Sequence, residues 1–329
     1  MADSPFLPAP ATTDGSDADP AGVGAGSSGY RALRNGFAAG AIERDVVIAE
    51  GPDAATFLQG QLSADVAALA AGASTWSWVL QPGGKVEVLA RVSRVDACRF
   101  ALDTDPGWGD ALAARLKRFK LRTKVDVSQP AWAVVALRGP DAQPPAPGTG
   151  VEVVADASWP GLVGYDLLGP GPAVPSGAVA LSPADLEIAR VEAGIVAMGA
   201  ELTERTIPAE TGLVERTVSF TKGCYTGQEL VARIDSRGSK VARRLCGLRL
   251  SGPGSGALSA GDTLRSEGKD VGSVTSVSLS PRLGPIALAY VRRAVEVGAT
   301  VTFAAGPVDA PTGDPDGVQG VVATLPLIA

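Results

Sequence analysis

Short apolar runs separated by Gly and Pro turns make up most of the chain. Their spacing predicts a strand at 46–48, followed by a helix that starts in 51–53 and ends near Gly60. Pro52 would occupy a favourable first position of that helix. Residues 76–80 and 85–95 predict two strands joined by a Gln-Pro-Gly-Gly turn, which is a typical hairpin pattern.

The next stretch contains segments with helical spacing and segments with strand spacing. Residues 108–119 have helical spacing, with Leu112, Leu116 and Phe119 on one face. Ser182 precedes Pro and, three residues on, an acidic residue, which predicts a capped helix start. Further strands are predicted at 99–103, 125–127 and 133–137.

Beyond residue 238 the pattern becomes one of successive strands, which predicts a small antiparallel β-barrel. These strands are expected at 241–250, 271–279, 286–290, 300–303 and 321–327. The fold class is therefore α+β with a C-terminal barrel. We expect three parts and one long loop: a disordered tail at 1–29, an α+β body at 30–238, a barrel at 239–329, and a loop at 305–320.

Composition is that of a water-soluble globular protein, with 45% hydrophobic and 19% charged residues. The net charge of −6 argues against a broad basic surface for nucleic acid, although a local basic patch remains compatible with it. No apolar run is long enough to span a membrane, and no basic residue precedes Arg31. The expected location is the cytoplasm, with no membrane partner and no stable nucleic-acid partner.

The chain contains no histidine and three cysteines without C-x-x-C spacing. The absence of histidine excludes Ser-His-Asp and Cys-His catalysis. The cysteine pattern argues against a disulfide framework or a resident metal site. Any acid–base chemistry would fall to Asp, Glu, Lys, Tyr or Cys.

The run from Lys222 to Glu229 is the strongest candidate for chemistry. It places Cys224 between two glycines, two residues after Lys222 and just before a predicted helix at 228–234. Cations and helix N-termini favour the reactive thiolate, so Cys224 is either a functional thiol or a small buried residue in a tight turn.

Two acidic residues each have two interpretations, and the two remaining cysteines have a structural one. Glu87 is either a proton acceptor facing a cleft or a solvent-facing strand residue, and Asp65 is either a ligand or a turn residue. Cys98 and Cys246 occur in strand-like segments and are expected to pack in the core.

The 222–229 run resembles the K-G-C-[FY]-x-G-Q-E signature of the YgfZ family, relatives of the glycine cleavage T-protein (aminomethyltransferase). Further matches lie at 51–61, 190–195, 208–210 and 231–234. In the barrel, 272–276 also fits, so that the resemblance covers about residues 40–300.

The resemblance implies a cloverleaf fold that holds tetrahydrofolate, or a one-carbon derivative, in its central hole. It implies that Cys224 is the functional thiol and that Lys222 aligns with a T-protein lysine. Residues expected to contact the folate are Tyr225, Gly227, Gln228, Glu229, Arg233, Glu87 and Asp65.

Two departures from the T-protein pattern bear on activity. Glu87-Val88 replaces an Asp-Asp pair, one carboxylate of which assists aminomethyl transfer. Leu162, within 159–166, stands where the T-protein has the glutamate that holds the pterin, and an apolar side chain accepts no hydrogen bonds.

Three functions remain open from the sequence. The first is a folate-binding accessory factor for iron–sulfur cluster assembly or repair in client enzymes, including tRNA-modifying ones. The second is a tetrahydrofolate-dependent aminomethyltransferase-like enzyme, with Glu87 or Asp65 as the acid–base group. The third is a protein- or RNA-binding module that does not use folate.

Overall fold

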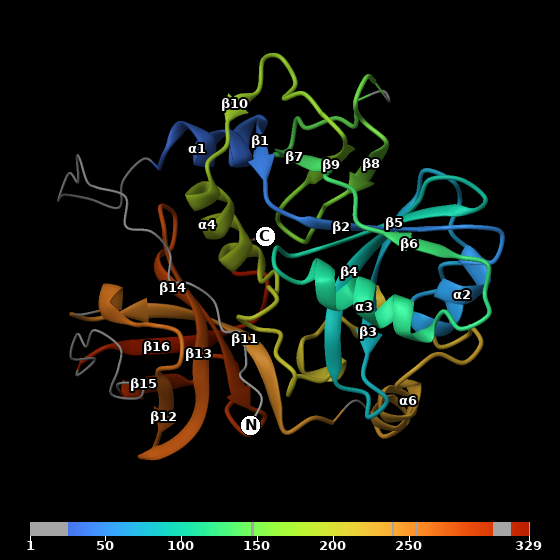
Figure 1. Ribbon diagram of the computed structural model, residues 1–329. Helices are drawn as coiled ribbons and strands as arrows, with labels where there is room; N and C mark the ends of the chain where they lie inside the picture. Colours follow the sequence, from blue (N-terminus) through green and yellow to red (C-terminus); the bar gives the residue numbers. More distant parts are fainter. Residues whose placement is uncertain (1–25, 146–147, 239, 254, 305–316, 329) are drawn as a thin grey trace, which may run out of the picture.

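The computed structural model describes residues 26–145, 148–238, 240–253, 255–304 and 317–328. Within these residues, two five-stranded sheets and a closed six-stranded barrel form the three lobes of the molecule (Figure 1). The predicted tail at 1–29 lies outside the described residues as far as residue 25, and helix α1 (Ser28–Asn35) then begins before Tyr30. Most of the predicted loop at 305–320 also lies outside them.

The first sheet has the strand order β10-β1-β7-β9-β8, with only the β10–β1 pair parallel. Its strands are β1 (Ala38–Ile42), β7 (Ala133–Arg138), β8 (Val153–Asp156), β9 (Gly164–Gly169) and β10 (Val179–Ala180). Helices α1 and α4 (Pro183–Ala193) pack on part of one face. Ser182 and Asp185 form the predicted capping box of α4, so that helix start is confirmed.

The second sheet is antiparallel, in the order β3-β4-β5-β2-β6. Its strands are β2 (Asp45–Glu50), β3 (Ser74–Leu80), β4 (Val86–Arg94), β5 (Arg99–Thr104) and β6 (Asp126–Ser128). Helices α2 (Ala54–Gln61) and α3 (Gly109–Phe119) cover one face through the largest apolar cluster. Pro52 precedes the capping residue Asp53 and is therefore not at the predicted first helical position.

The C-terminal barrel has the order β11-β14-β13-β12-β15-β16, and pairing of β11 with β16 closes it. Its strands are β11 (Arg243–Ser251), β12 (Thr263–Ser266), β13 (Lys269–Ser280), β14 (Gly284–Arg292), β15 (Thr300–Ala304) and β16 (Gln319–Ala323). The last strand ends at Ala323, short of the predicted residue 327. The α+β class with a C-terminal antiparallel barrel is confirmed.

A connecting segment between α4 and the barrel carries two short helices, α5 (Val214–Thr217) and α6 (Gln228–Ser236). It also holds a 3₁₀ turn at Pro208–Glu210. The segment packs on the β3–β4 hairpin and on the barrel through an apolar cluster that includes Trp78, Tyr225 and Leu288. The barrel is thereby fixed to the second sheet.

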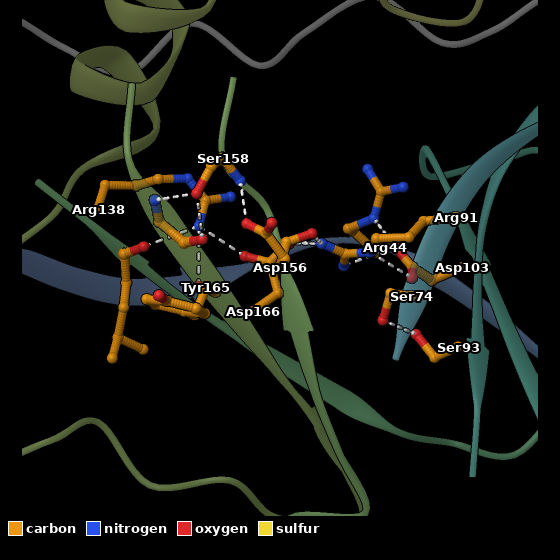
Figure 2. A network of polar contacts seen from close by, with 12 residues as sticks. Arg44, Ser74, Arg91, Ser93, Asp103, Arg138, Asp156, Ser158, Tyr165 and Asp166 are labelled. Carbon is orange, nitrogen blue, oxygen red and sulfur yellow. Dashed lines mark hydrogen bonds and ion pairs between the residues drawn. The ribbon is translucent and has the colours of Figure 1, made fainter. Parts of the chain in front are cut away.

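The two sheets face each other across a small apolar contact and a buried ion-pair chain. Val46 and Ile48 of β2 pack against Val134 and Leu168 of the first sheet. Beside them, Arg91 of β4 donates from Nε and Nη2 to Asp103 of β5, both at 3.0 Å. Its Nη1 lies 2.8 Å from Asp166 Oδ2 on β9, which joins the sheets (Figure 2).

We expect Asp166→Asn to lower the free energy of unfolding by about 3 kcal/mol, because it would leave Arg138 buried without its counter-charge and Arg91 with Asp103 alone. Asp270→Asn is the matched control, since its pair with Arg265 is exposed and worth less than about 1 kcal/mol. Urea unfolding of both variants measures the difference. Equal losses would contradict a special role for the buried chain.

The Asp166 contribution should also depend on pH. Its pKa is lower in the folded protein than the 3.8 of an unperturbed carboxyl, so the stabilisation is fully present above that value and declines as the pH falls below it toward the lower folded-state pKa. The stability gap between wild type and Asp166→Asn should therefore shrink below about pH 4. A gap that stays constant between neutral and acidic pH would refute this linkage.

Candidate functional site

A central cavity of about 770 Å³ lies where the two sheets meet α4. The second sheet contributes Trp76 and Leu89, and the first sheet contributes Arg138 and Asp166. The remaining lining comes from 41–44, 105–106, 157–162, 183–190 and 195–197. This volume is in the range of small-molecule sites.

Two tryptophans and Arg44 form an aromatic corner of this cavity, and Arg216, which is not among the lining residues, stacks on one of the tryptophans. The rings of Trp76 and Trp159 are 5.6 Å apart and inclined at 54°. Arg44 lies over the Trp76 ring at 5.7 Å, and Arg216 lies over the Trp159 ring at 4.3 Å. Such a corner suits a flat conjugated ligand, because aromatic faces and guanidinium planes both stack on one.

The charged wall of the cavity continues the buried chain between the sheets (Figure 2). Arg138 Nη1 lies 2.7 Å from Asp166 Oδ1, and Arg44 Nη1 lies 2.8 Å from Asp105 Oδ1. Burial alone would raise the pKa of Asp166, but Arg138 and Arg91 outweigh it and hold this pKa well below its usual range. Asp166 is therefore a fixed anion in the wall.

Two donors beside the cavity have no hydrogen-bond partner among the described residues: Arg44 Nη2 and Trp76 Nε1. Both atoms are buried, and buried polar groups are rarely left unpaired in native proteins. A ligand with acceptor atoms would satisfy them after a small side-chain rotation. The cavity is therefore suited to a flat, polar molecule.

Lys222 fixes the 222–229 run to the end of α2. Its Nζ donates to the carbonyl oxygens of Gln59 and Leu62 at 2.7 Å and of Ala64 at 2.8 Å. The last carbonyls of a helix lack partners within the helix, so Lys222 acts as a cap. Burial lowers the pKa of Lys222 to about 8, against the opposing effect of the Asp65 carboxylate. All three ammonium donors face carbonyls.

Gly227 and Tyr225 place the run against the β3–β4 hairpin. A Cβ on Gly227, whose φ is +82°, would lie 2.6 Å from the Gln81 carbonyl oxygen. Tyr225 is buried, and burial raises its pKa to about 12. The Gln228 side chain accepts from the Tyr225 backbone N–H at 3.1 Å, where the predicted helix begins. These residues therefore have packing roles.

Cys224 is exposed, so the buried interpretation of this thiol is wrong. No cluster of three or more His, Cys, Asp or Glu side chains suited to a metal ion occurs in the described residues. Cys246 is buried in the barrel as predicted. Cys98, predicted to be in the core, is exposed in the turn between β4 and β5, and that prediction is wrong.

The two carboxylates proposed for chemistry are engaged elsewhere. Glu87 Oε2 accepts from Arg115 Nε at 3.1 Å, and Asp65 Oδ1 accepts from Gln59 Nε2 at 2.8 Å. The turn interpretation of Asp65 is thus supported. Glu229 and Arg233 are exposed on α6.

None of the nine predicted site residues is among the residues that line the central cavity. The β3 strand separates the two regions: Trp76 borders the cavity, while the turn after Leu80 contacts Gly227. The strand rise puts these points roughly 15 Å apart. The structure therefore contains two candidate regions, a central cavity and a surface thiol.

Sequence reasoning missed the cavity residues themselves, which include Trp76, Trp159, Arg44, Arg138 and Asp166. A partial signal existed, since Trp159 and Asp166 bound the segment that resembles the T-protein pterin stretch. Leu162 of that segment does line the cavity.

None of the helices in the described part of the chain is both long and apolar enough to cross a membrane. Nothing else in the described residues tests the predicted cytoplasmic location.

Comparison with known proteins identifies relatives of the barrel and of most of the chain. The family model of the glycine cleavage T-protein C-terminal barrel domain matches residues 243–310. An aminomethyltransferase of Rubrobacter xylanophilus is 29% identical over 290 residues, covering 79% of this chain and 77% of that protein.

Two further relatives match a smaller part. An uncharacterized protein of Haemophilus influenzae is 31% identical over 207 residues, covering 58% of this chain and 65% of its own length, just under two thirds. A mitochondrial iron-sulfur cluster assembly factor (IBA57 homolog) of Pyricularia oryzae is 29% identical over 226 residues, covering 64% of this chain and 55% of its own length.

The fold also matches a solved structure. The glycine cleavage system aminomethyltransferase T from Bartonella henselae superposes with a TM-score of 0.74 at 23% identity, covering 94% of this chain and 90% of that one. The barrel model, the relatives and the matching fold together show that this chain is similar to the glycine cleavage T-protein and its relatives in the C-terminal barrel and in the overall fold.

Proposed function

We propose that this protein is a tetrahydrofolate-binding accessory factor for the assembly or repair of iron–sulfur clusters in other proteins. The observation that carries the proposal is the exposed Cys224, in a turn that Lys222 and Gly227 fix in place; among the described residues no cysteine and carboxylate set suited to a metal lies with it. A single thiolate suits transient contact with a cluster or persulfide on a partner. The relative named as an iron-sulfur cluster assembly factor supports this choice.

The residues of the central cavity fit a folate. Trp76 and Trp159 would stack on the pterin, and the unpaired donors of Arg44 and Trp76 would meet acceptor atoms elsewhere on the folate. Asp166, which its arginine partners keep ionised despite burial, would accept from pterin N–H groups. When bound, tetrahydrofolate supplies a carrier for a one-carbon unit.

The aminomethyltransferase alternative is less well supported. Neither Glu87 nor Asp65, the predicted acid–base groups, lines the cavity, and both are engaged by neighbouring side chains. Cys224 also lies away from the cavity, so its thiol is better placed to act on a partner than on a folate-borne carbon. A cytoplasmic location and tRNA-modifying clients remain part of the proposal.

Trp76→Leu should weaken tetrahydrofolate binding at least about tenfold, because it removes a stacking face and a donor from the cavity. Titration followed by protein fluorescence and by the shift in melting temperature measures the affinity. Trp132→Leu is the control, since Trp132 does not line this cavity. If wild type shows no binding, or if both variants lose it equally, the folate assignment is wrong.

Cys224→Ala should lose most of its ability to restore a cluster-dependent enzyme in cells that lack this protein, while tetrahydrofolate affinity stays within about twofold. Cys98→Ala, which removes the other exposed thiol, should restore activity fully. Full rescue by Cys224→Ala would show that the thiol is not needed for this function. Turnover of an aminomethylated carrier by wild type would favour the transferase alternative.

Lys222→Met should destabilise the protein by about 2 kcal/mol, because it leaves three carbonyls at the end of α2 without their charged donor. Lys85→Met, at an exposed position of the neighbouring hairpin, should change stability by less than about 0.5 kcal/mol. Urea unfolding measures both. If Lys222→Met left the stability unchanged, the structural role would be wrong, and activation of the Cys224 thiol would be the better explanation of Lys222.

A further inference from the structure

The end of α3 and the turn after it carry a dense group of cations on an otherwise acidic protein. Five of the eight residues from 117 to 124 are Lys or Arg, whereas the whole chain has a net charge of −6. We call this group the basic surface; it consists of Lys117, Arg118, Lys120, Arg122 and Lys124.

Most of this charge is unpaired. Lys120 lies 3.3 Å from Asp126, whose side chain is 97% exposed, so that pair is weak. Within the described residues, no ion pair joins Lys117, Arg122 or Lys124 to a carboxylate. Like charges held together at a surface repel one another, so this arrangement lowers stability unless something anionic binds it.

An exposed leucine lies among these cations. Leu121 is 87% exposed and has a φ of +41°, in the left-handed region that leucine rarely adopts. With Lys117, Lys120 and Val127 it lines a surface groove of about 670 Å³. Strain in an exposed apolar residue points to a role in contact, because Gly or Asn would fit the backbone better.

The basic surface lies at one end of α2 and Cys224 at the other. The Lys124 backbone N–H donates to Asp53 Oδ2 at 2.8 Å, just before α2 begins. The Thr226 N–H donates to the Gly60 carbonyl oxygen at 3.3 Å near its end. The helix has 8 residues, a length of about 12 Å. Figure 1 shows α3, α2 and α6 grouped on the same lobe.

We infer that the basic surface docks an acidic segment of a partner protein and thereby brings that partner within reach of Cys224. Carboxylates would pair with the unpaired cations, and an apolar side chain would contact Leu121. A protein segment fits better than RNA, because the groove offers an exposed aliphatic side chain and no exposed aromatic ring for base stacking. The inference rests on the proposed function in one respect only, the role of the Cys224 thiol.

Binding is tested with a fluorescent acidic peptide of about twelve residues with one central leucine, and with a neutral version that has Gln at each acidic position. Fluorescence anisotropy should give at least about tenfold tighter binding of the acidic peptide, weakening as salt rises. Equal binding of the two peptides would overturn the inference.

Two triple charge reversals locate the contact. The variant of the basic surface should lose at least about tenfold in affinity, and a variant of exposed barrel cations should lose less than about twofold. The first carries Lys117→Glu, Arg122→Glu and Lys124→Glu. The second carries Lys269→Glu, Arg282→Glu and Arg292→Glu. Equal losses would mean that net charge, and not this surface, binds the peptide.

Leu121→Gly separates docking from folding. It should raise the melting temperature, because glycine accepts the left-handed backbone, and should weaken peptide binding about threefold or more. Unchanged binding would remove Leu121 from the contact. Tighter binding of a single-stranded oligouridylate than of the peptide, lost in the same charge reversal, would assign the surface to nucleic acid and overturn the inference.

Reach to Cys224 is tested in the Cys98→Ala background. The acidic peptide carries a terminal cysteine as a mixed disulfide with thionitrobenzoate. The Cys224 thiolate attacks the peptide sulfur, forms a protein–peptide disulfide and releases coloured thionitrobenzoate. The acidic peptide should react at least about tenfold faster than the neutral one, and reversal of the basic surface should abolish most of that advantage.

An advantage that survives the reversal would mean that cations beside Cys224 attract the peptide, and would overturn docking at the basic surface. These assays need neither folate nor a cluster, so their failure is distinguishable from failure of the proposed function. If Cys224→Ala rescues cells fully while the peptide still binds, the docking surface stands without that function.

Discussion

The ion pair between Arg91 and Asp166 fixes the relation between the two sheets and therefore the shape of the central cavity. Arg91 is held from its own sheet by both oxygens of Asp103, so its remaining donor has one direction in which to extend. Asp166 meets it from the other sheet and also meets Arg138. Buried charges carry a desolvation cost, so their gain here is in fixing one geometry more than in raising stability.

A second constraint concerns the 222–229 run. Several of its residues make packing contacts, whereas Cys224 does not. Lys222 caps α2, Gly227 allows close approach to the hairpin, and Tyr225 fills the interface with the barrel. Each would be required by packing in any protein with this arrangement. Cys224 has no such contact and is exposed, so packing does not explain it. The chemistry expected of the whole run therefore narrows to this thiol.

The sequence pattern was sufficient to predict those elements whose stabilising contacts join residues close together in the chain. The capping box at Ser182 and the β3–β4 hairpin are encoded within a few residues and were predicted. The cavity wall was not, because its partners lie on strands far apart in sequence and a buried Asp such as Asp166 has no signature of its own. Cys98 failed for a related reason: apolar neighbours in strands on both sides conceal a turn.

The separation of the thiol from the cavity constrains how the two regions work together. A folate held between the sheets could influence Cys224 through β3, which runs from Trp76 at the cavity to the turn against Gly227. That strand is buried from Ser77 to Leu80 and pairs with β4 along its length, with one irregularity between Val79 and Leu80, so it favours a fixed relation over a moving one. A lone surface thiol gains specificity only from what its partner contacts nearby. The unpaired cations at the other end of α2 are therefore the part of this lobe most suited to choosing that partner.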